Sequence, residues 1–386
     1  MSSKQEVVII GGGVVGCSIA YHLAKQGIPS LILERDSIAS QASGKGWAVF
    51  TPPANLILSE GTLVPKGAMR LLTGFNREGV DRIPELAQEL RDVGGLDTGF
   101  GHLPMMRLIY SESDEKKLKD AVAELKKENF DIDWIGPNNI KTQVPDVVPG
   151  YRGAIFLKTA YVVEPYKYTL ALAQAAEAKG ASIRQGEAVG LRVQGRKVSS
   201  VVLTTGEIEA GVVVLAMGPW SGEAVSSWLG KEIPMEIHRD QCMVVETPKP
   251  LPPVRITTPL ASGASIIPHV DGKVVLGRVE HDVVDFDQRT TEGFRLSVME
   301  SALATLPLLE DARLVEHRAG LESWQPNGAD PVLGQFPGFD NLYVATRMAT
   351  MGMQWSPTVG RAMADLIATG RVDKLIEPFP PDKYIK

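Results

Sequence analysis

The first 34 residues follow a pattern that few folds can accommodate. An apolar run at 6–10 leads into a glycine-rich turn at 11–16, which opens an apolar, helix-like segment that ends near Gln26. A second apolar run at 30–33 ends on the acidic residue Glu34. Strand, glycine turn, helix, strand and terminal acid in this order are the fingerprint of a βαβ unit that binds a dinucleotide. We therefore expect a Rossmann-like domain in which Glu34 accepts hydrogen bonds from the hydroxyls of one ribose.

The residues of the glycine turn have separate physical roles. Gly11 permits a tight turn out of the first strand, Gly13 lets the backbone approach the phosphates, and Gly16 lets the helix pack closely on the sheet. Val14 and Val15 begin the helix, where free N–H groups and the positive end of the helix dipole can hold a pyrophosphate. The motif thus predicts a binding site as well as a fold.

Composition excludes several classes of function. The chain has 386 residues, of which 44% are apolar and 22% charged, with a net charge of −6. This length allows two domains, and the charge favours neither nucleic acid nor an anionic membrane as a partner. No apolar run is long enough to span a bilayer, and the six histidines show no metal-ligand spacing, so we expect no metal. Cys17 and Cys242 form no disulfide framework, which favours a cytoplasmic location.

The rest of the chain predicts two kinds of architecture. Apolar runs at 212–216 and 341–346 are typical of buried parallel strands. Further short strands are expected at 182–185, 188–193, 198–203 and 207–209. The predicted helices are 78–93, 113–129, 165–179 and 357–369. Alternating, antiparallel strands are expected at 235–247, 254–257, 264–267 and 273–280.

These elements predict an α/β plus α+β fold. A Rossmann-like nucleotide domain is expected from three separated pieces, with a mixed, largely antiparallel β-sheet domain inserted between them to bind substrate. The expected pieces of the nucleotide domain are 1–80, 148–226 and 316–386. The expected pieces of the inserted domain are 81–147 and 227–315.

Seven blocks of sequence, spread over nearly the whole chain, carry a family resemblance. The blocks are 11–35, 42–46, 163–165, 212–221, 267–277, 317–331 and 344–360. In this order they resemble the D-amino-acid oxidase, glycine oxidase and sarcosine oxidase family of flavoproteins, and glycine oxidase in particular. The resemblance implies non-covalently bound FAD and oxidation of a C–N bond in a small amine or in an amino acid, whether N-substituted or not. Hydride transfer to flavin N5 would give an imine that hydrolyses, with O2 or another acceptor taking the electrons.

The resemblance also implies which residues hold FAD. Besides the glycine turn, it places Glu34 on the ribose, Arg35 beside the adenine, and Ser43 and Gly44 on the pyrophosphate. Further expected cofactor contacts are Lys45, Trp47, Val189, Gly218, Trp220, Met348, Thr350, Met351, Gly352 and Met353. A helix N-terminus after this last segment would stabilise the reduced flavin. Because an amine with a free lone pair can lose hydride unaided, no catalytic residue is assigned.

The chain departs from its relatives where substrate binds. Glu322 stands at the position where amino-acid-binding members carry an arginine that holds the substrate carboxylate, and Thr350 replaces a second arginine. One reading is that Glu322 holds a cationic group, with the rings of Trp47, Trp324 or Trp355 nearby. A second is that Arg278 or Arg347 binds the carboxylate from another wall. A third is that Glu322 simply pairs with Arg347.

The electron acceptor and the reaction class stay open at this point. Sarcosine oxidases carry an oxygen-activating lysine where this chain has Val275, so oxidase and dehydrogenase remain alternatives. The competing functions are a flavin dehydrogenase of a 2-hydroxy acid and the flavin subunit of a hetero-oligomeric amino-acid or opine-type dehydrogenase. A homo-oligomer is compatible with all of these readings.

Overall fold

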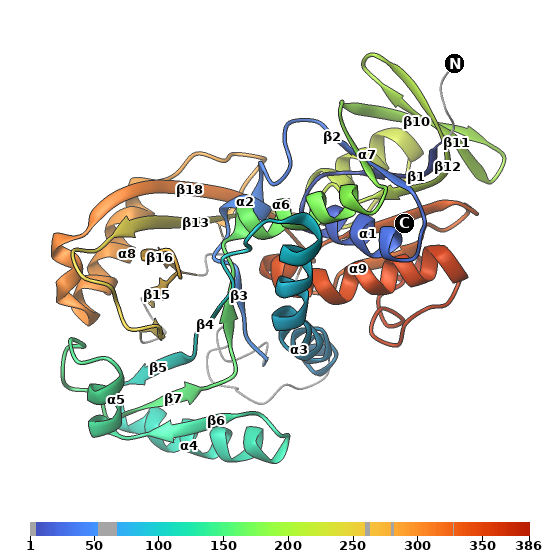
Figure 1. Cartoon of the computed structure of the whole chain (residues 1–386). Helices are drawn as coiled ribbons and strands as arrows, with labels where there is room; N and C mark the ends of the chain where they lie inside the picture. Colours follow the sequence, from blue (N-terminus) through green and yellow to red (C-terminus); the bar gives the residue numbers. More distant parts are fainter. Residues whose placement is uncertain (1–4, 53–67, 259–262, 279–281, 327) are drawn as a thin grey trace.

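The structure, a computed structural model, describes residues 5–52, 68–258, 263–278, 282–326 and 328–386. Its elements gather around two large sheets that lie side by side (Figure 1). The short helix α2 (Ala42–Lys45) lies between them, because it contacts both α6 (Pro165–Ala178) on one sheet and β18 (Arg313–Trp324) in the other. Among the described residues, no helix combines the length and apolar character that crossing a membrane requires.

The first sheet is mixed, with parallel strands from distant parts of the chain at its centre. Its strands are β1 (Gln5–Ile10), β2 (Ser30–Glu34), β9 (Ser182–Gln185), β10 (Ala188–Gln194), β11 (Lys197–Leu203), β12 (Gly206–Leu215), β19 (Val332–Gln335) and β20 (Leu342–Thr346). β1 runs parallel to β2 and β12, and these pair in turn, also in parallel, with β9 and β20. The pairs β10–β11, β11–β12 and β19–β20 are antiparallel. The predicted Rossmann-like sheet is confirmed, except that the two strands expected at 207–209 and 212–216 form the single strand β12.

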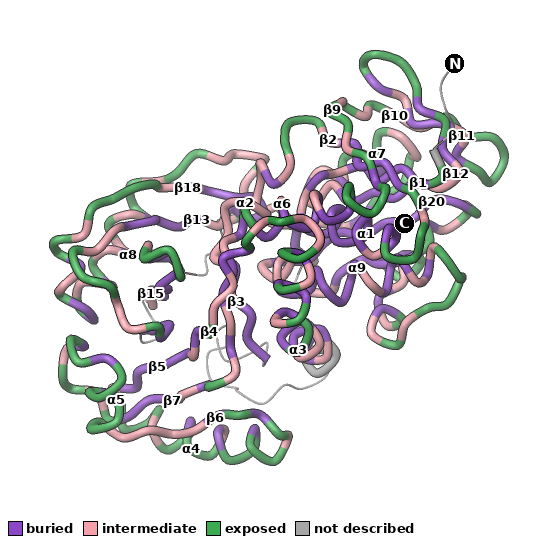
Figure 2. The backbone as a smooth tube through the Cα atoms, in the orientation of Figure 1, coloured by how far each residue is buried: buried purple, intermediate pink, exposed green. Residues whose placement is uncertain are grey.

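Three helices pack tightly on this sheet. α1 (Val14–Lys25) contacts α6 and α9 (Gly352–Thr369), and Figure 2 shows α1 buried along most of its length. Gly360 lets α9 approach α1, because a Cβ at this position would lie 2.0 Å from Ser18 Oγ. Ser18 Oγ in turn donates to the carbonyl of Ser356 at 2.7 Å. The contact therefore depends on small residues on both helices.

α9 begins five residues earlier than the sequence predicts, and Pro357 lies inside it. A proline cannot donate to the carbonyl four residues before it, here that of Met353. Ser356 Oγ donates to this carbonyl instead, at 2.8 Å. The side chain thus replaces the missing backbone hydrogen bond, and the helix continues back to Gly352.

The second sheet is mostly antiparallel. Its strands are β5 (Met105–Ile109), β6 (Ile132–Ile135), β7 (Gly153–Leu157), β13 (Glu236–Glu246), β14 (Arg255–Thr257), β15 (Ser265–Pro268), β16 (Lys273–Gly277), β17 (Asp282–Val283) and β18. β14 runs parallel to β5, and the other pairs are antiparallel. Successive residues of β5 belong to hydrophobic clusters on opposite faces of the sheet. Met106 lies in the cluster that includes α8 (Glu292–Thr305), and Met105 lies in the cluster that includes α4 (Glu112–Lys127).

The remaining elements are small or peripheral. A three-stranded sheet is formed by β3 (Val49–Phe50), β4 (Gly101–His102) and β8 (Tyr161–Val162). The remaining helices are α3 (Ala68–Gly94), α5 (Pro137–Gln143) and α7 (Trp220–Leu229), with short 3-10 turns at η1 (Pro307–Asp311), η2 (Ala349–Met351) and η3 (Pro381–Lys383). The outer faces of α4 and α5 are largely exposed in Figure 2.

The two sheets divide the chain at points that differ from the expected boundaries. α3 starts at Ala68 rather than 78 and crosses the boundary at residue 80, and it contacts α6 and α9 of the first sheet. β7 lies in the piece expected in the nucleotide domain but pairs in the second sheet. β18 crosses the boundary at 316 and pairs with β13 along its length. The chain passes between the two sheets in the segments before β5, after β7, before β13 and after β18.

Candidate functional site

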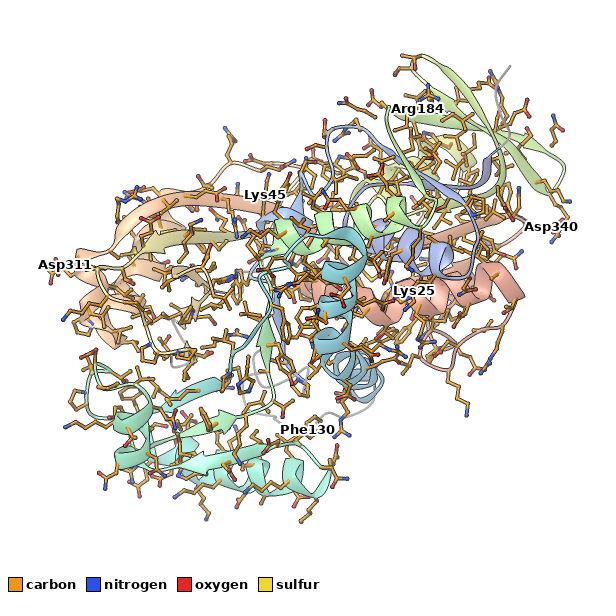
Figure 3. The ribbon with its side chains drawn as sticks, viewed as in Figure 1. Lys25, Lys45, Phe130, Arg184, Asp311 and Asp340 are labelled. Atoms are coloured by element: carbon orange, nitrogen blue, oxygen red, sulfur yellow. The ribbon has the colours of Figure 1, made fainter. Side chains whose placement is uncertain are left out.

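A cavity of about 600 Å³ lies at the junction of the two sheets. The carboxyl ends of β1, β2, β12 and β20 form one side of it, and β13, β14 and β18 of the second sheet contribute to the other. Figure 3 places Lys45, at the end of α2, near this junction. In open parallel sheets the crevice outside the carboxyl ends of the strands is the usual place for a ligand.

The glycine turn leaves no room for side chains. Gly11 has φ +115°, and a Cβ there would lie 2.4 Å from the carbonyl oxygen of Ala216. A Cβ at Gly16 would lie 2.1 Å from the carbonyl oxygen of Gly11. Gly44 is packed as closely, since its Cβ would lie 2.2 Å from the oxygen of Ala39. Gly11 lines the cavity, whereas Gly16 and Gly44 lie behind the wall and hold it together.

The first turn of α1 and the end of β2 place polar groups at this end of the cavity. Ser43 Oγ accepts a hydrogen bond from the N–H of Val14 at 2.9 Å, next to Gly13. The Glu34 carboxylate accepts from the N–H groups of Gly12, at 2.6 Å, and Asp36, at 2.9 Å. These bonds hold the acid at the carboxyl end of its strand, where it lines the cavity.

Three further predicted cofactor contacts also line the cavity. The guanidinium carbon of Arg35 lies 5.4 Å from the ring centroid of Trp220. Val189, from β10, exposes 45% of its surface. Arg35, Val189 and Trp220 all line the cavity, so these expected cofactor contacts come together although they are up to 185 residues apart in sequence.

The other end of the cavity is formed where β20 meets α9. Met348, Thr350, Met351, Gly352 and Met353 all line it. Gly218, in the left-handed region at φ +54°, is fixed there by its carbonyl, which accepts from Thr346 Oγ1 at 2.8 Å. Because α9 starts at Gly352, its N-terminus lies in the cavity wall, as the predicted flavin contact requires.

The residues fit a bound dinucleotide. Gly11 admits no Cβ, the first turn of α1 offers backbone N–H groups, and the acid at the end of β2 is in place for a ribose. Lys45 does not line the cavity; its Nζ donates to Gln288 Oε1 at 3.3 Å, which turns the side chain toward the second sheet.

Two of the predicted substrate residues do not line the cavity because they are buried elsewhere. Arg347 donates from Nε to the carbonyl of Asp330 at 2.8 Å and from Nη1 to that of Pro234 at 3.0 Å. Trp355 is 1% exposed and donates to Asn76 Oδ1 at 2.6 Å. Arg347 is thus wrongly predicted to bind a carboxylate or to pair with Glu322, and Trp355 is wrongly predicted to contact substrate.

Arg278 is also outside the cavity wall. A Cβ at the preceding residue, Gly277, would point at the ring of Trp47, at 2.6 Å, and successive residues of a strand face opposite sides. Arg278 therefore points the other way, where its guanidinium carbon lies 5.9 Å from the ring centroid of Phe294 on α8. The expectation that Arg278 binds the substrate carboxylate is wrong for this arrangement.

Glu322, by contrast, lines the cavity. It lies on β18 opposite His238 of β13 and accepts a hydrogen bond from Trp324 Nε1 at 3.1 Å. Burial raises the pKa of the Glu322 carboxyl to about 7, although the Trp324 hydrogen bond acts in the opposite direction. Near neutral pH this group can therefore either carry a proton or hold a charge.

Two charged residues of the second sheet that the sequence analysis did not single out also line the cavity. They are Asp240 on β13 and Arg255 on β14. The only signal for Arg255 is an arginine between two apolar residues, Val254 and Ile256, in a predicted strand. No spacing rule connects it with the glycine turn, because the two lie in different sheets.

Comparison with known proteins agrees with this geometry. The chain matches the family of FAD dependent oxidoreductases abbreviated DAO over residues 6–366, and it belongs to that family. It is 29% identical to a glycine oxidase of Pseudomonas aeruginosa over 381 residues, which cover 98% of each chain. The predictions of an enzyme, of FAD and of the family are confirmed.

Solved structures show the same fold. A glycine oxidase from Bacillus cereus superposes with a TM-score of 0.86 at 26% identity, covering 97% of this chain and 98% of the other. An iminodiacetate oxidase from Chelativorans sp. BNC1 gives a TM-score of 0.86 at 21% identity, covering 97% of this chain and 99% of that one. The predicted fold class, a Rossmann-like FAD domain with a second sheet domain, is therefore confirmed.

Proposed function

We propose that this FAD-dependent oxidoreductase oxidises the C–N bond of a small amine or an amino acid, including N-substituted ones. The observation that carries the proposal is one cavity that extends from the glycine turn, past the N-terminus of α9, to Glu322 on the second sheet. The glycine oxidase relatives named above, which match along nearly the whole chain, support the same class of substrate.

We assign the cofactor contacts to residues of the first sheet. Gly11, Gly13, Val14 and Val15 would lie along the pyrophosphate, with Ser43 closing that side. The remaining contacts proposed from the cavity wall are Glu34, Arg35, Trp47, Val189, Gly218, Trp220, Met348, Thr350, Met351, Gly352 and Met353. When bound, FAD supplies the acceptor for a hydride from the substrate carbon, and the resulting imine hydrolyses.

We assign Glu322 to the amino group of the substrate. An amine loses hydride from its carbon only with its nitrogen lone pair free, so an ammonium ion must first give up a proton. A carboxyl group whose pKa burial has raised to about 7 can take that proton near neutral pH. The half-buried position in the cavity wall also limits access of water to the reacting atoms.

The test is anaerobic mixing of the purified holoenzyme with a panel of compounds. The panel contains primary amines, glycine, N-methylglycine, D- and L-amino acids and 2-hydroxy acids, and the measurement is loss of the oxidised flavin absorbance. Amines or amino acids are expected to reduce the flavin. If only 2-hydroxy acids reduce the flavin, the proposal is refuted and the protein is a flavin dehydrogenase of a 2-hydroxy acid.

The same sample identifies the electron acceptor. Air is admitted after reduction, and return of the oxidised spectrum is timed with and without an artificial acceptor. We propose that oxygen reoxidises the flavin slowly, because Val275 stands where sarcosine oxidases carry a lysine. Reoxidation as fast with oxygen as with the artificial acceptor would contradict this.

We also propose a cytoplasmic location. Cys17 and Cys242 are both free thiols, and both are buried. A chain with free thiols and no disulfide among its described residues suits a reducing compartment. Cell fractionation with an antibody to the protein tests this.

A further inference from the structure

Arg255 is a buried cation with one hydrogen-bond partner. It lines the cavity from β14 and is 1% exposed. Its Nη2 donates to Ser265 Oγ at 3.0 Å, whereas the buried Nε and Nη1 have no acceptor among the described residues. A buried donor without an acceptor costs free energy, and an uncompensated buried charge costs more. The arrangement becomes favourable once a ligand supplies the missing acceptors.

Trp47 provides a third unpaired donor beside it. The Arg255 guanidinium carbon lies 5.7 Å from the ring centroid of Trp47. Trp47 Nε1 is also buried and has no acceptor among the residues that the structure describes. Gly277 makes room for this ring, because a Cβ there would lie 2.6 Å from Nε1. Arg255 and Trp47 both line the cavity, and together they carry three N–H donors that have no acceptor among the described residues.

The surroundings of Arg255 do not neutralise it. Burial lowers the pKa of Arg255 to about 10, and no carboxylate of the described residues acts in the opposite direction. The guanidinium therefore stays charged at neutral pH. A dinucleotide pyrophosphate is provided for by the glycine turn of the first sheet, whereas Arg255 lies in the second sheet. The missing counter-charge must come from another anion in the cavity.

We propose that Arg255 and Trp47 bind a carboxylate of the substrate, which is therefore an amino acid or an N-substituted amino acid rather than a simple amine. This inference rests on the proposed function and narrows its substrate class. A carboxylate can accept from a guanidinium through both oxygens, which matches the two unpaired nitrogens of Arg255. An amino acid also carries an amino group, which suits Glu322 in the same cavity.

The test is equilibrium binding to the oxidised holoenzyme, followed by the change in flavin absorption. The probes are acetate, propionate and benzoate, each compared with its uncharged amide. The wild type is expected to bind at least one carboxylate more tightly than its amide. Arg255→Met is expected to weaken carboxylate binding by about 10- to 100-fold, the range for hydrogen bonds to charged groups, and to leave amide binding unchanged. A carboxylate preference that survives in Arg255→Met overturns the proposal.

Thermal unfolding separates this role from a merely structural one. Because Arg255→Met removes an uncompensated buried charge, it is expected to raise the melting temperature of the holoenzyme without substrate by about 2–4 °C. A lower melting temperature together with loss of FAD would mean that Arg255 supports the fold or the cofactor, and it would overturn the proposal. Arg255→Lys repeats the binding test if the methionine variant does not fold; carboxylate binding as tight as in the wild type would overturn the proposal.

Arg107→Met is the matched control. Arg107 lies on the neighbouring strand β5 and is 2% exposed, but it does not line the cavity. Its replacement is expected to leave the preference for carboxylates intact. Binding of the probes requires no turnover, so the carboxylate site at Arg255 and the proposed oxidation of a C–N bond can be refuted independently of each other. If no amine reduces the flavin while carboxylates still bind through Arg255, the proposed function fails and the carboxylate site stands.

Discussion

At the scale of single residues, Glu322 places a titratable carboxyl group in the second-sheet wall of the cavity. Burial raises the pKa of its carboxyl to about 7 in the folded protein, above the ordinary value of 4.5. Between these two pH values the folded state binds more protons at this site than the unfolded state does. The free energy of unfolding therefore decreases as pH rises through this window. Above about pH 7 the buried carboxylate is ionised, and the whole of this loss of stability is present.

Glu322→Gln is expected to remove this part of the pH dependence. At pH 8 the variant should be more stable than the wild type by roughly 1–3 kcal/mol, and at pH 4.5 the two should be similar. Urea unfolding of the holoenzyme at both pH values measures this. Glu316→Gln, an exposed acid on the same strand, is the control and should follow the wild type. Equal stability of Glu322→Gln and wild type at pH 8 would show that the carboxyl is not buried as described.

The positions of the two thiols decide whether a cysteine can attach the flavin covalently. Cys242 donates to the carbonyl of Lys45 at 3.3 Å, and burial raises the pKa of its thiol to about 11. Neither Cys17 nor Cys242 lines the cavity. We therefore expect acid precipitation to release all flavin into the supernatant, where chromatography identifies FAD. Flavin that stays with the precipitated chain would contradict the assignment of a non-covalent cofactor.

At the scale of elements, the contact between α1 and α9 holds the cofactor cavity together. α1 carries the glycine turn at its start, and α9 presents its own N-terminus to the other end of the cavity. The two helices cross where Gly360 meets Ser18. A change at this crossing therefore reaches both ends of the site without touching its lining.

Gly360→Ala is expected to destabilise the protein by about 1–3 kcal/mol, because the new Cβ would also lie 2.8 Å from the backbone carbon of Ser18. The fraction of purified protein that contains FAD should also be lower in Gly360→Ala than in the wild type. The control is Gly293→Ala on α8, where nothing lies within 4 Å of the added Cβ and helix propensity predicts a gain of up to ~1 kcal/mol. Urea unfolding measures both, and equal effects of the two changes would refute close packing at Gly360.

At the scale of the whole molecule, Arg347 ties distant segments together. Its guanidinium donates to the carbonyls of Asp330 and Pro234 and lies 4.4 Å from the ring centroid of Tyr384. The hydroxyl of Tyr384 in turn donates to the Asp330 carboxylate at 2.9 Å. The C-terminal segment is thus fixed to the end of β20 and to the segment that leads into the second sheet.

Arg347→Met is expected to cost about 2–4 kcal/mol of stability, because it leaves two carbonyls without their donor. The KM for the substrate that the anaerobic panel identifies should not change, because Arg347 does not line the cavity. Arg371→Met, an exposed change just after α9, is the control and should alter neither quantity. A raised KM with unchanged stability would contradict this and would support the earlier prediction that Arg347 binds the substrate.

The sequence by itself determined the nucleotide half of this protein. The glycine turn, the first two strands and the acid Glu34 are near neighbours in the chain, and steric rules on glycine and strand alternation connect them directly to their positions. The same local rules located the strands β12 and β20, whereas the family resemblance supplied most of the other residues of the cavity wall, from Arg35 to Met353. Local geometry was sufficient for these strands because the carboxyl ends of β1, β2, β12 and β20 all lie at the same edge of one sheet.

Only the tertiary structure decided the substrate half. Arg278, Arg347 and Trp355 were reasonable predictions from their sequence positions, but strand alternation, carbonyl acceptors and core packing direct them away from the cavity. Arg255, on β14, and Trp47, just before β3, lie together although about 200 residues separate them in the sequence. Which way a side chain points across a sheet depends on a register set by the whole domain, so the places of Asp240 and Arg255 in the cavity wall emerged only from the folded chain.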